Sequence, residues 1–316
     1  MTKSEKAAQT VITKCLELQK DESVLVLASE QMMEIAEPLH RACLRKTKNA
    51  FLLKLGKLGN SPILHDSIGT LMKNVDVVLA VTSPSISHTP IRRQASLNGT
   101  RIASLPNITL NTFCRLNSVN YEKTARLAGK LADILTMAKE VRLTAPNGTD
   151  LTVPINQRKG FADTGLLNWP GAFSNLPAGE AYVSPADGGT QGILVVDSGM
   201  YIGADEREQL RLQIKDGKAV RISGGLAARR LRQHLGKFGT KSRLIAEFGI
   251  GTNDAMRISG HELEDEKMLG TAHIGIGNNI SFGGSNDIPV HLDAVVYKAS
   301  VLIDGKQILN QGKLVL

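Results

Sequence analysis

The sequence predicts an α/β protein in two parts: an N-terminal domain built on an open α/β sheet, residues 1–140, and a C-terminal β-rich (α+β) domain, residues 141–316. Three observations lead to this prediction. A chain of 316 residues exceeds the size of one ordinary hydrophobic core. Before residue 140, continuous apolar runs alternate with amphipathic segments, which is typical of a parallel sheet covered on both faces. After it, short β-like runs are joined by Asp-Gly and Asn-Gly turns.

The elements of the first domain follow from the spacing of apolar residues. Helical spacing appears near the start of the chain and again before residue 141, where the segment is strongly amphipathic. Between them, short apolar runs have the length of buried strands. We expect helices at 5–20, 32–47 and 120–141, and strands at 23–29, 50–56, 75–82 and 100–106.

The second domain begins with a hairpin whose turn is Asn147–Gly148. Residues 208–225 and 300–316 alternate apolar and polar side chains around Asp-Gly turns, so they predict further hairpins. One amphipathic segment, 225–237, interrupts this β pattern and predicts a helix.

The composition is typical of a soluble globular protein, with 42% hydrophobic and 22% charged residues. The three cysteines, Cys15, Cys43 and Cys114, have no paired spacing, which argues against a disulfide framework and fits a reducing compartment. The polar start MTKSEKAAQTVITK lacks the apolar region of a signal peptide, and no apolar run has the length of a membrane span. We therefore expect a cytoplasmic protein without a membrane partner.

The net charge of +8 is concentrated between Arg211 and Arg243, where ten lysines and arginines face one acid, Asp216. Such a stretch could bind phosphate or nucleic acid. It could also be a solvated helix whose arginines lie along the surface. Aromatic residues make up only 4% of the chain, and no recognition motif accompanies the charge. We therefore expect the solvated helix and no nucleic-acid partner.

The candidate functional residues stand in glycine-rich β segments of the C-terminal half. EFGIGTN and, about twenty residues later, HIGIGNN are near-copies headed by an acid and by a histidine. In PVHLDAVV, a histidine and an aspartate are two residues apart, so a strand would direct both to one face. With the acid of NLPAGEAY, the candidate metal ligands are Glu180, Glu247, His273, His291 and Asp293.

These donors suit a metal centre. Mixed imidazole and carboxylate ligation favours Zn²⁺, Co²⁺ or Mn²⁺, whereas a thiolate site would need cysteines that the pattern lacks. Two such ions, roughly 3.5–4 Å apart, can polarise a carbonyl and activate a water molecule. Each residue alone has an ordinary explanation, such as a surface turn acid or a hydrogen-bonded core histidine. Four segments of this kind in one half of the chain favour the metal site.

The order of these motifs resembles the M29 metallo-aminopeptidases, also called aminopeptidase T or S, over roughly residues 140–316. NLPAGE, the Glu-led glycine segment, Asp265-Glu266, HIGIG and HLD carry the resemblance. It implies an α/β domain, a catalytic β-rich domain, a homodimer, and two divalent metal ions (Zn, Co or Mn) held jointly by the five ligands. The implied activity removes N-terminal residues from a peptide substrate.

The resemblance also suggests roles for individual residues. Glu180 or Glu247 would carry a proton from water to the leaving amine. Asp265 or Glu266 would hold the free ammonium of the substrate. The family's catalytic tyrosine is absent after HIGIG, so Tyr182 and Tyr297 are the remaining candidates for this role. The acidic motif also departs from the family's Asp-Glu-Asn, because it continues with Lys267.

Three alternatives stay open. A related branch, similar to 2,5-dihydroxypyridine dioxygenase, binds one Fe(II) through two histidines and one carboxylate, for which His273, His291 and Asp293 could serve. That branch resembles HLD well but carries a histidine where Glu247 stands, and the presence of both Glu180 and Glu247 favours two ions over one iron. The chain could also be a non-catalytic metal or peptide binder. The last alternative is a nucleic-acid binder acting through residues 211–243.

Overall fold

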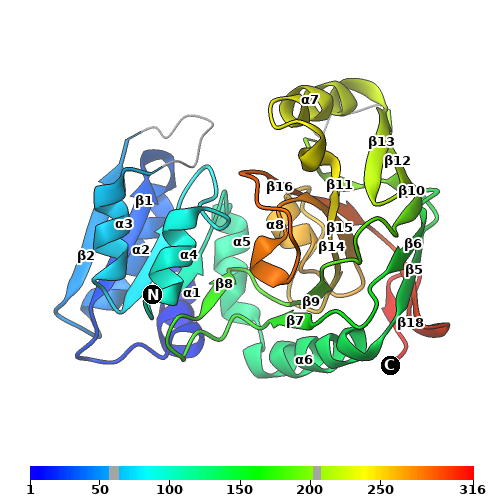
Figure 1. The fold of residues 1–316 in the computed structure, drawn as a ribbon. Helices are drawn as coiled ribbons and strands as arrows, with labels where there is room; N and C mark the ends of the chain where they lie inside the picture. The colour runs from blue at the N-terminus through cyan, green and yellow to red at the C-terminus, as the bar shows by residue number, and fades with distance from the viewer. Residues whose placement is uncertain (57–63, 202–207) are drawn as a thin grey trace. The chain divides into compact units, whose positions relative to one another are not determined.

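The computed structural model describes residues 1–56, 64–201 and 208–316, which form two compact units (Figure 1). Unit 1 consists of Met1–Ala125 and Thr164–Ala178, and unit 2 of Arg126–Asp163 and Gly179–Leu316. The chain therefore passes between the units three times, whereas the sequence analysis placed one boundary near residue 140. Residues 164–178 return to unit 1 because they add a strand to its sheet.

Unit 1 is built on a five-stranded sheet in the order β2-β1-β3-β4-β8. Each neighbouring pair is parallel, so the carboxyl ends of the strands share one edge. The central strands are buried over their whole length, as their continuous apolar runs predicted. The bounds are β1 (Val24–Ser29), β2 (Ala50–Leu55), β3 (Val77–Val81), β4 (Arg101–Ser104) and β8 (Phe173–Asn175).

Helices cover this sheet. Met72 of α3 and Ala95 of α4 pack with Leu25, Val78 and Ile102 on one face, while α2 packs against β1 and α1. Short π and 3₁₀ turns extend some of the helices. The bounds are α1 (Lys3–Thr10), the π turn Val11–Cys15, the 3₁₀ turn Glu30–Met32, α2 (Met33–Leu44), α3 (Asp66–Lys73), α4 (Pro90–Leu97), α5 (Leu110–Arg115), the 3₁₀ turn Leu116–Ser118 and α6 (Tyr121–Met137), which continues into unit 2.

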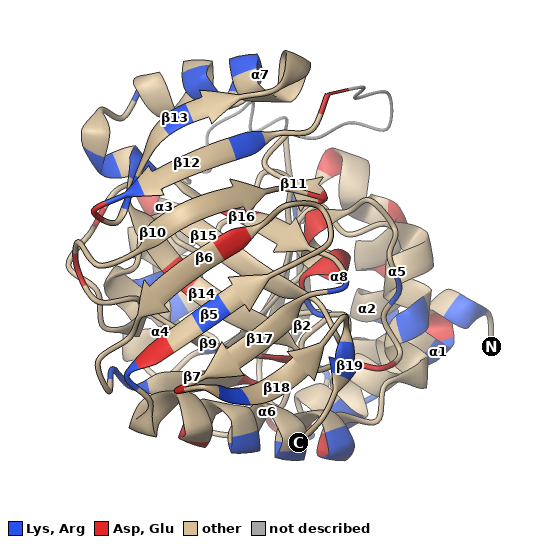
Figure 2. Cartoon of the chain, turned by 90° about the vertical axis from the view of Figure 1, so that its right-hand side faces the viewer, with Lys and Arg blue, Asp and Glu red and all other residues tan. Residues whose placement is uncertain are grey.

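Unit 2 contains two antiparallel sheets. The larger has eight strands in the order β13-β12-β10-β6-β5-β17-β18-β19 (Figure 2). Its first hairpin joins β5 and β6 around Asn147, where the sequence predicted the turn. The bounds are β5 (Glu140–Thr144), β6 (Asp150–Pro154), β10 (Gln191–Val195), β12 (Arg211–Lys215), β13 (Lys218–Ser223), β17 (Ser300–Ile303), β18 (Lys306–Asn310) and β19 (Lys313–Leu314).

The smaller sheet has six strands in the order β11-β16-β15-β14-β9-β7. One face of it contributes Phe248 and Ile274 to a core cluster that also contains Leu143 and Leu151 of the larger sheet. The core therefore lies between the two sheets, and the other face of the smaller sheet is left for polar residues. The bounds are β7 (Gly160–Asp163), β9 (Glu180–Val183), β11 (Ser198–Gly199), β14 (Ile245–Gly251), β15 (Ala272–Gly277) and β16 (His291–Val296).

The basic stretch forms β12, β13, α7 (Gly225–Gly236) and the 3₁₀ turn Thr240–Arg243. Helix α7 buries Ala228 and Leu231 and exposes Arg229 and Arg230. Figure 2 shows several blue bands of lysine or arginine along α7. This is the arrangement expected of a solvated amphipathic helix. No described helix is both long and apolar enough to cross a membrane.

Candidate metal centre

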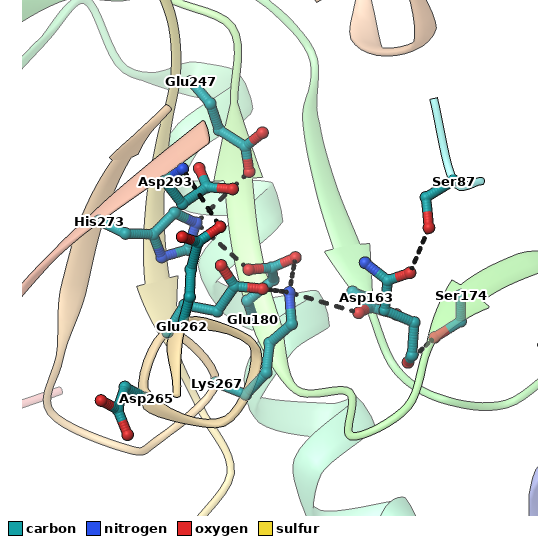
Figure 3. Close-up of polar contacts among 12 residues, drawn as sticks. Ser87, Asp163, Ser174, Glu180, Glu247, Glu262, Asp265, Lys267, His273 and Asp293 are labelled. Carbon is teal, nitrogen blue, oxygen red and sulfur yellow. Dashed lines mark hydrogen bonds and ion pairs between the residues drawn. The ribbon is translucent and has the colours of Figure 1, made fainter. Parts of the chain in front are cut away.

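All five predicted ligand residues lie on the face of the six-stranded sheet that points away from the core cluster. Glu180 begins β9, Glu247 lies in β14, His273 in β15, and His291 and Asp293 in β16. Strand side chains alternate between faces, so the residues beside them enter the core. Figure 3 shows the labelled members of this set pointing toward one another. The structure therefore brings together the five residues that the sequence analysis grouped.

Glycines lie across from these side chains in the strand register. Gly275 pairs with Glu247 on one side and with Asp293 on the other, and Gly249 pairs with His273. A Cβ atom on Gly275 would lie 2.8 Å from Oδ1 of Asp293, and one on Gly249 would collide with the imidazole ring of His273. The two glycine-rich near-copies in the sequence therefore interlock, since each supplies the space that the other's functional side chain occupies.

The donor atoms form two groups that share Glu247: Glu180 with Glu247 and His273, and Glu247 with His291 and Asp293. Nε2 of His273 lies 3.2 Å from Glu180 Oε2 and 3.4 Å from Glu247 Oε1. Nε2 of His291 lies 3.3 Å from both Glu247 Oε2 and Asp293 Oδ1. Ligands about 2.1 Å from one ion lie roughly 3.0–3.4 Å from each other at octahedral or tetrahedral angles. Both groups therefore have the spacing of a metal site.

Hydrogen bonding prepares this site for an ion. Nδ1 of His291 lies 2.7 Å from the carbonyl oxygen of Asn278 and donates to it, which leaves Nε2 as the nitrogen that faces the carboxylates. Oδ1 of Asp293 and Oε2 of Glu180 are buried and, among the described residues, accept no hydrogen bond of ordinary geometry, although a histidine Nε2 lies 3.3 Å and 3.2 Å from them. Buried carboxylate oxygens without donors are costly, and a cation between them would remove that cost. The residues present therefore fit a bound metal.

The charges in the group depend on each other. Burial disfavours the carboxylate of Glu247, but hydrogen bonds with His273 and His291 outweigh burial and hold its pKa below its usual range. Burial likewise disfavours the imidazolium of His273, yet Glu247 and Glu180 raise its pKa to about 9. Burial opposes the charged form of His291 as well, while Asp293 and Glu247 raise its pKa well above the ordinary value. Without a metal, protons occupy the places on these two rings where an ion would bind.

Residues 252–271, here called the connecting segment, join β14 to β15 and add acids that the ligand prediction did not include. From α8 (Glu262–Asp265) and the turn after it, Glu262 and Glu266 reach Asp293, and the three form a further group of carboxylates. Burial and the charge of Asp293 raise the pKa of Glu262 to about 7. Asp163 joins them from β7, where it pairs with Glu180. The sequence offered no local signal for Asp163 or Glu262, because strand pairing and the path of the segment bring them here.

Lys267 also enters the group from the connecting segment. Its side chain is 2% exposed, and Nζ lies 2.5 Å from Glu180 Oε1 and 2.9 Å from Glu266 Oε1. Oδ2 of Asp163 lies 3.8 Å away (Figure 3). Burial opposes the charge on this ammonium, but Glu180, Glu266 and Asp163 raise its pKa well above the ordinary value. The sequence analysis noted Lys267 only as a departure from a motif, whereas the structure makes it part of the centre.

Asp265 has a different position from the one expected of a substrate-binding acid. Its carboxylate accepts hydrogen bonds from Ser198 Oγ at 2.6 Å, from the backbone N–H of Ser259 at 2.7 Å and of Gly260 at 3.0 Å, and from the hydroxyl of Tyr297 at 2.7 Å. Both of its oxygens are therefore used by protein donors. Asp265 holds the connecting segment in place, and no acceptor remains for the ammonium that the sequence analysis assigned to it. Tyr297, a candidate for the missing tyrosine, is committed to the same contact.

Aromatic side chains lie beside the imidazole of His291. Phe282, in the 3₁₀ turn Ile280–Phe282, meets this ring edge-on at a centroid distance of 5.9 Å. Tyr182 packs edge-on against Phe282 at 5.5 Å and stacks on Phe161 at 5.6 Å. Because Tyr182 lies two residues after Glu180 in β9, its side chain is on the same face as the ligand candidates. The centre therefore has an aromatic side next to its ionic one.

A protein-family model described as NicX, 2,5-dihydroxypyridine 5,6-dioxygenase, matches residues 4–316. The chain belongs to the NicX family. The match covers nearly the whole chain, so both units are part of it. No curated protein sequence matches the chain.

Solved structures agree with this family. The 2,5-dihydroxypyridine dioxygenase of Pseudomonas putida KT2440 superposes with a TM-score of 0.83 at 20% sequence identity, over 100% of this chain and 98% of the other. Wild-type AmpT of Thermus thermophilus superposes with a TM-score of 0.71 at 15% identity, over 99% of each chain. At these identities the likeness concerns the fold, and it supports the predicted α/β class and the M29-like architecture.

The comparisons correct the functional prediction. A zinc- or cobalt-dependent hydrolase acting in proteolysis is wrong, because the family is one of dioxygenases. The roles of Glu180 and Glu247 in peptide hydrolysis are withdrawn with it. The iron triad of the alternative stays a prediction. Among the described residues, His291 and Asp293 group with Glu247, and His273 groups with Glu180 and Glu247. The expected homodimer stays a prediction.

Proposed function

We propose that this chain is a metal-dependent dioxygenase that opens a hydroxylated nitrogen-containing aromatic ring, with a dihydroxypyridine as the substrate class. The family match over residues 4–316 is the observation that carries the proposal. The donor groups on the six-stranded sheet support it, since oxygenases of this kind need an ion with ligands on one side and open positions on the other.

Glu247, His291 and Asp293 are the proposed ligands. Their donor atoms lie within 4.8 Å of one another, and the hydrogen bond from His291 to Asn278 fixes the ring so that Nε2 points into the group. Nitrogen and oxygen donors of this kind suit Fe(II). When bound, a ferrous ion supplies the one-electron chemistry that lets O₂ react with an organic ring.

The remaining residues would position the substrate. Phe282, Tyr182 and Phe161 offer ring faces and edges beside His291, and a flat aromatic substrate gains from such contacts. The carboxyl groups of Glu262 and Glu266, next to Asp293, are placed to accept hydrogen bonds from ring hydroxyls.

The proposal is tested by loading the purified chain with Fe(II) without oxygen and then adding 2,5-dihydroxypyridine with ¹⁸O₂. We expect oxygen uptake, loss of the ring absorbance and two labelled oxygen atoms in the product. His291→Ala should remove the activity, while His261→Ala, the same change at an exposed histidine, should leave it intact. A metal-loaded chain that consumes no oxygen with any dihydroxypyridine would refute the proposal.

A further inference from the structure

The two donor groups that share Glu247 raise the question of how many ions the centre holds. Glu247 directs Oε1 toward His273 and Oε2 toward His291, at 3.4 Å and 3.3 Å. A carboxylate placed in this way can bridge two cations. The position of Lys267 distinguishes the two groups.

The Lys267 ammonium contacts only one of the two donor groups that share Glu247. It contacts Glu180, which belongs to the group with His273, through Oε1. Within the described part of the chain, it forms no ion pair with Glu247 or Asp293, the carboxylates of the other group. The positive charge is therefore present on the Glu180 side before any metal arrives.

The connecting segment holds this lysine firmly. The backbone N–H of Asn253 donates to the carbonyl oxygen of Lys267 at 2.9 Å, and the N–H of Lys267 donates to Glu264 at 3.2 Å. Three carboxylates surround its Nζ, and the side chain is almost wholly buried. A buried ammonium in such a setting stays charged and in place, because its removal would leave the carboxylates unpaired.

We propose that the Lys267 ammonium acts as a built-in cation in place of a second metal ion, so that the centre binds one ion, at Glu247, His291 and Asp293. An ion on the free oxygen of Glu180 would lie across one carboxylate from the ammonium, and like charges at that range repel. The inference deepens the proposed function and rests on its metal centre, but it concerns the number and place of ions rather than the reaction.

Metal stoichiometry tests the inference without any assay of activity. The metal-free chain is titrated with Mn²⁺, and bound metal is counted by elemental analysis while electron paramagnetic resonance reports whether two ions are coupled. The wild type should bind one uncoupled Mn²⁺. His273→Ala should keep that ion, whereas His291→Ala should lose it.

Lys267→Met removes the charge and keeps most of the length of the side chain. This variant should bind a second Mn²⁺ about 10–100-fold more tightly than the wild type, since contacts to metal ligands change affinity by about that factor. The pair of ions should give a coupled spectrum. Lys267→Arg should still bind one ion, and Lys215→Met, the same change at an exposed lysine, should behave as wild type.

Circular dichroism decides whether Lys267→Met folds. If it does not, the double variant Lys267→Met, Glu266→Gln removes one opposing charge as well and should show the same second ion. The inference is overturned by two ions or none in the wild type, or by a folded variant that still binds one ion at saturating Mn²⁺. One ion without dioxygenase activity would refute the proposed function alone, and two ions with activity would refute this inference alone.

Discussion

Replacement of Gly275 by alanine tests how the glycine-rich strands create the metal centre. Gly275 pairs with Glu247 and Asp293, so it lies between two of the proposed ligands. A Cβ atom there would be 2.8 Å from Asp293 Oδ1, 2.9 Å from Glu247 Cβ and 2.9 Å from His291 Cε1. The new methyl group therefore meets all three proposed ligands at once.

The size of the effect follows from these distances. Ordinary contacts between carbon atoms are about 3.5–4.0 Å, so the ligands must move by more than half an ångström. Overpacking of this kind costs about 1–3 kcal/mol, while a Gly→Ala change in an ordinary backbone conformation returns about 0.4–1 kcal/mol. The fold should therefore lose roughly 0–2.5 kcal/mol. Displaced ligands should weaken metal binding about 10–100-fold, or about 1.4–2.8 kcal/mol.

The assay is competition for Mn²⁺ with a chelator of known affinity, together with urea unfolding in EDTA so that metal does not mask stability. Gly129→Ala in helix α6 is the matched control, because among the described residues no atom beyond the adjacent backbone of this helix lies within 4 Å of the added Cβ. It should leave metal affinity unchanged and stabilise the chain by about 0.5–1 kcal/mol. Wild-type affinity in Gly275→Ala would show that the glycine does not make room for ligands.

Four further outcomes are expected. Neighbouring carboxylates hold the pKa of His291 well above its ordinary value in the metal-free chain, so a proton competes with Mn²⁺ for this ring. The Mn²⁺ affinity should therefore rise about tenfold per pH unit near neutrality. An affinity independent of pH would contradict this. The pKa of His273 is about 9 in the metal-free folded chain, against about 6.5 when the chain is unfolded. The charged ring therefore stabilises the fold fully below about pH 6.5, and this contribution should be lost as the pH rises through 9. Thermal unfolding in EDTA can follow the loss. Asp265→Asn should destabilise the chain by about 2–4 kcal/mol in urea unfolding, because it weakens several charged hydrogen bonds. Tyr297→Phe should cost only about 1 kcal/mol, because it removes one donor. Equal values for the two variants would argue against the anchoring role of Asp265. Burial raises the pKa of the Cys43 thiol to about 12, so iodoacetamide should label it only after unfolding, as mass spectrometry would show.

Local patterns predicted the elements of the fold well. The amphipathic segment 120–141 became α6 (Tyr121–Met137), and the apolar run 75–82 became β3 (Val77–Val81). The α/β class is confirmed, because alternating strands and helices have few other solutions. The return of residues 164–178 to unit 1 was not predictable in this way. The strand there, β8, has three residues, and only its pairing with β4 identifies it.

The site shows the same division between local and distant information. His291 and Asp293 share a face because they are two residues apart, and the glycines near each candidate indicated close packing. Lys267 and Glu262 carry no such signal, since an acid or a lysine after a short helix is usually a surface residue. Their positions beside the ligands depend on the path of the connecting segment, which Asp265 fixes through Ser198 and Tyr297. Spacing in the sequence contains none of those contacts.

The six-stranded sheet and the connecting segment contribute differently to the centre. The six-stranded sheet buries Phe248 and Ile274 on one face, so the packing of this core does not involve the donors on the other face. The sheet supplies donors and the glycines that make room for them, while the connecting segment supplies the charges that decide which donors remain available. A change at Lys267 therefore alters the centre from outside the strands. Two solved structures share the fold at only 20% and 15% identity, so the fold by itself does not determine the residues of the centre.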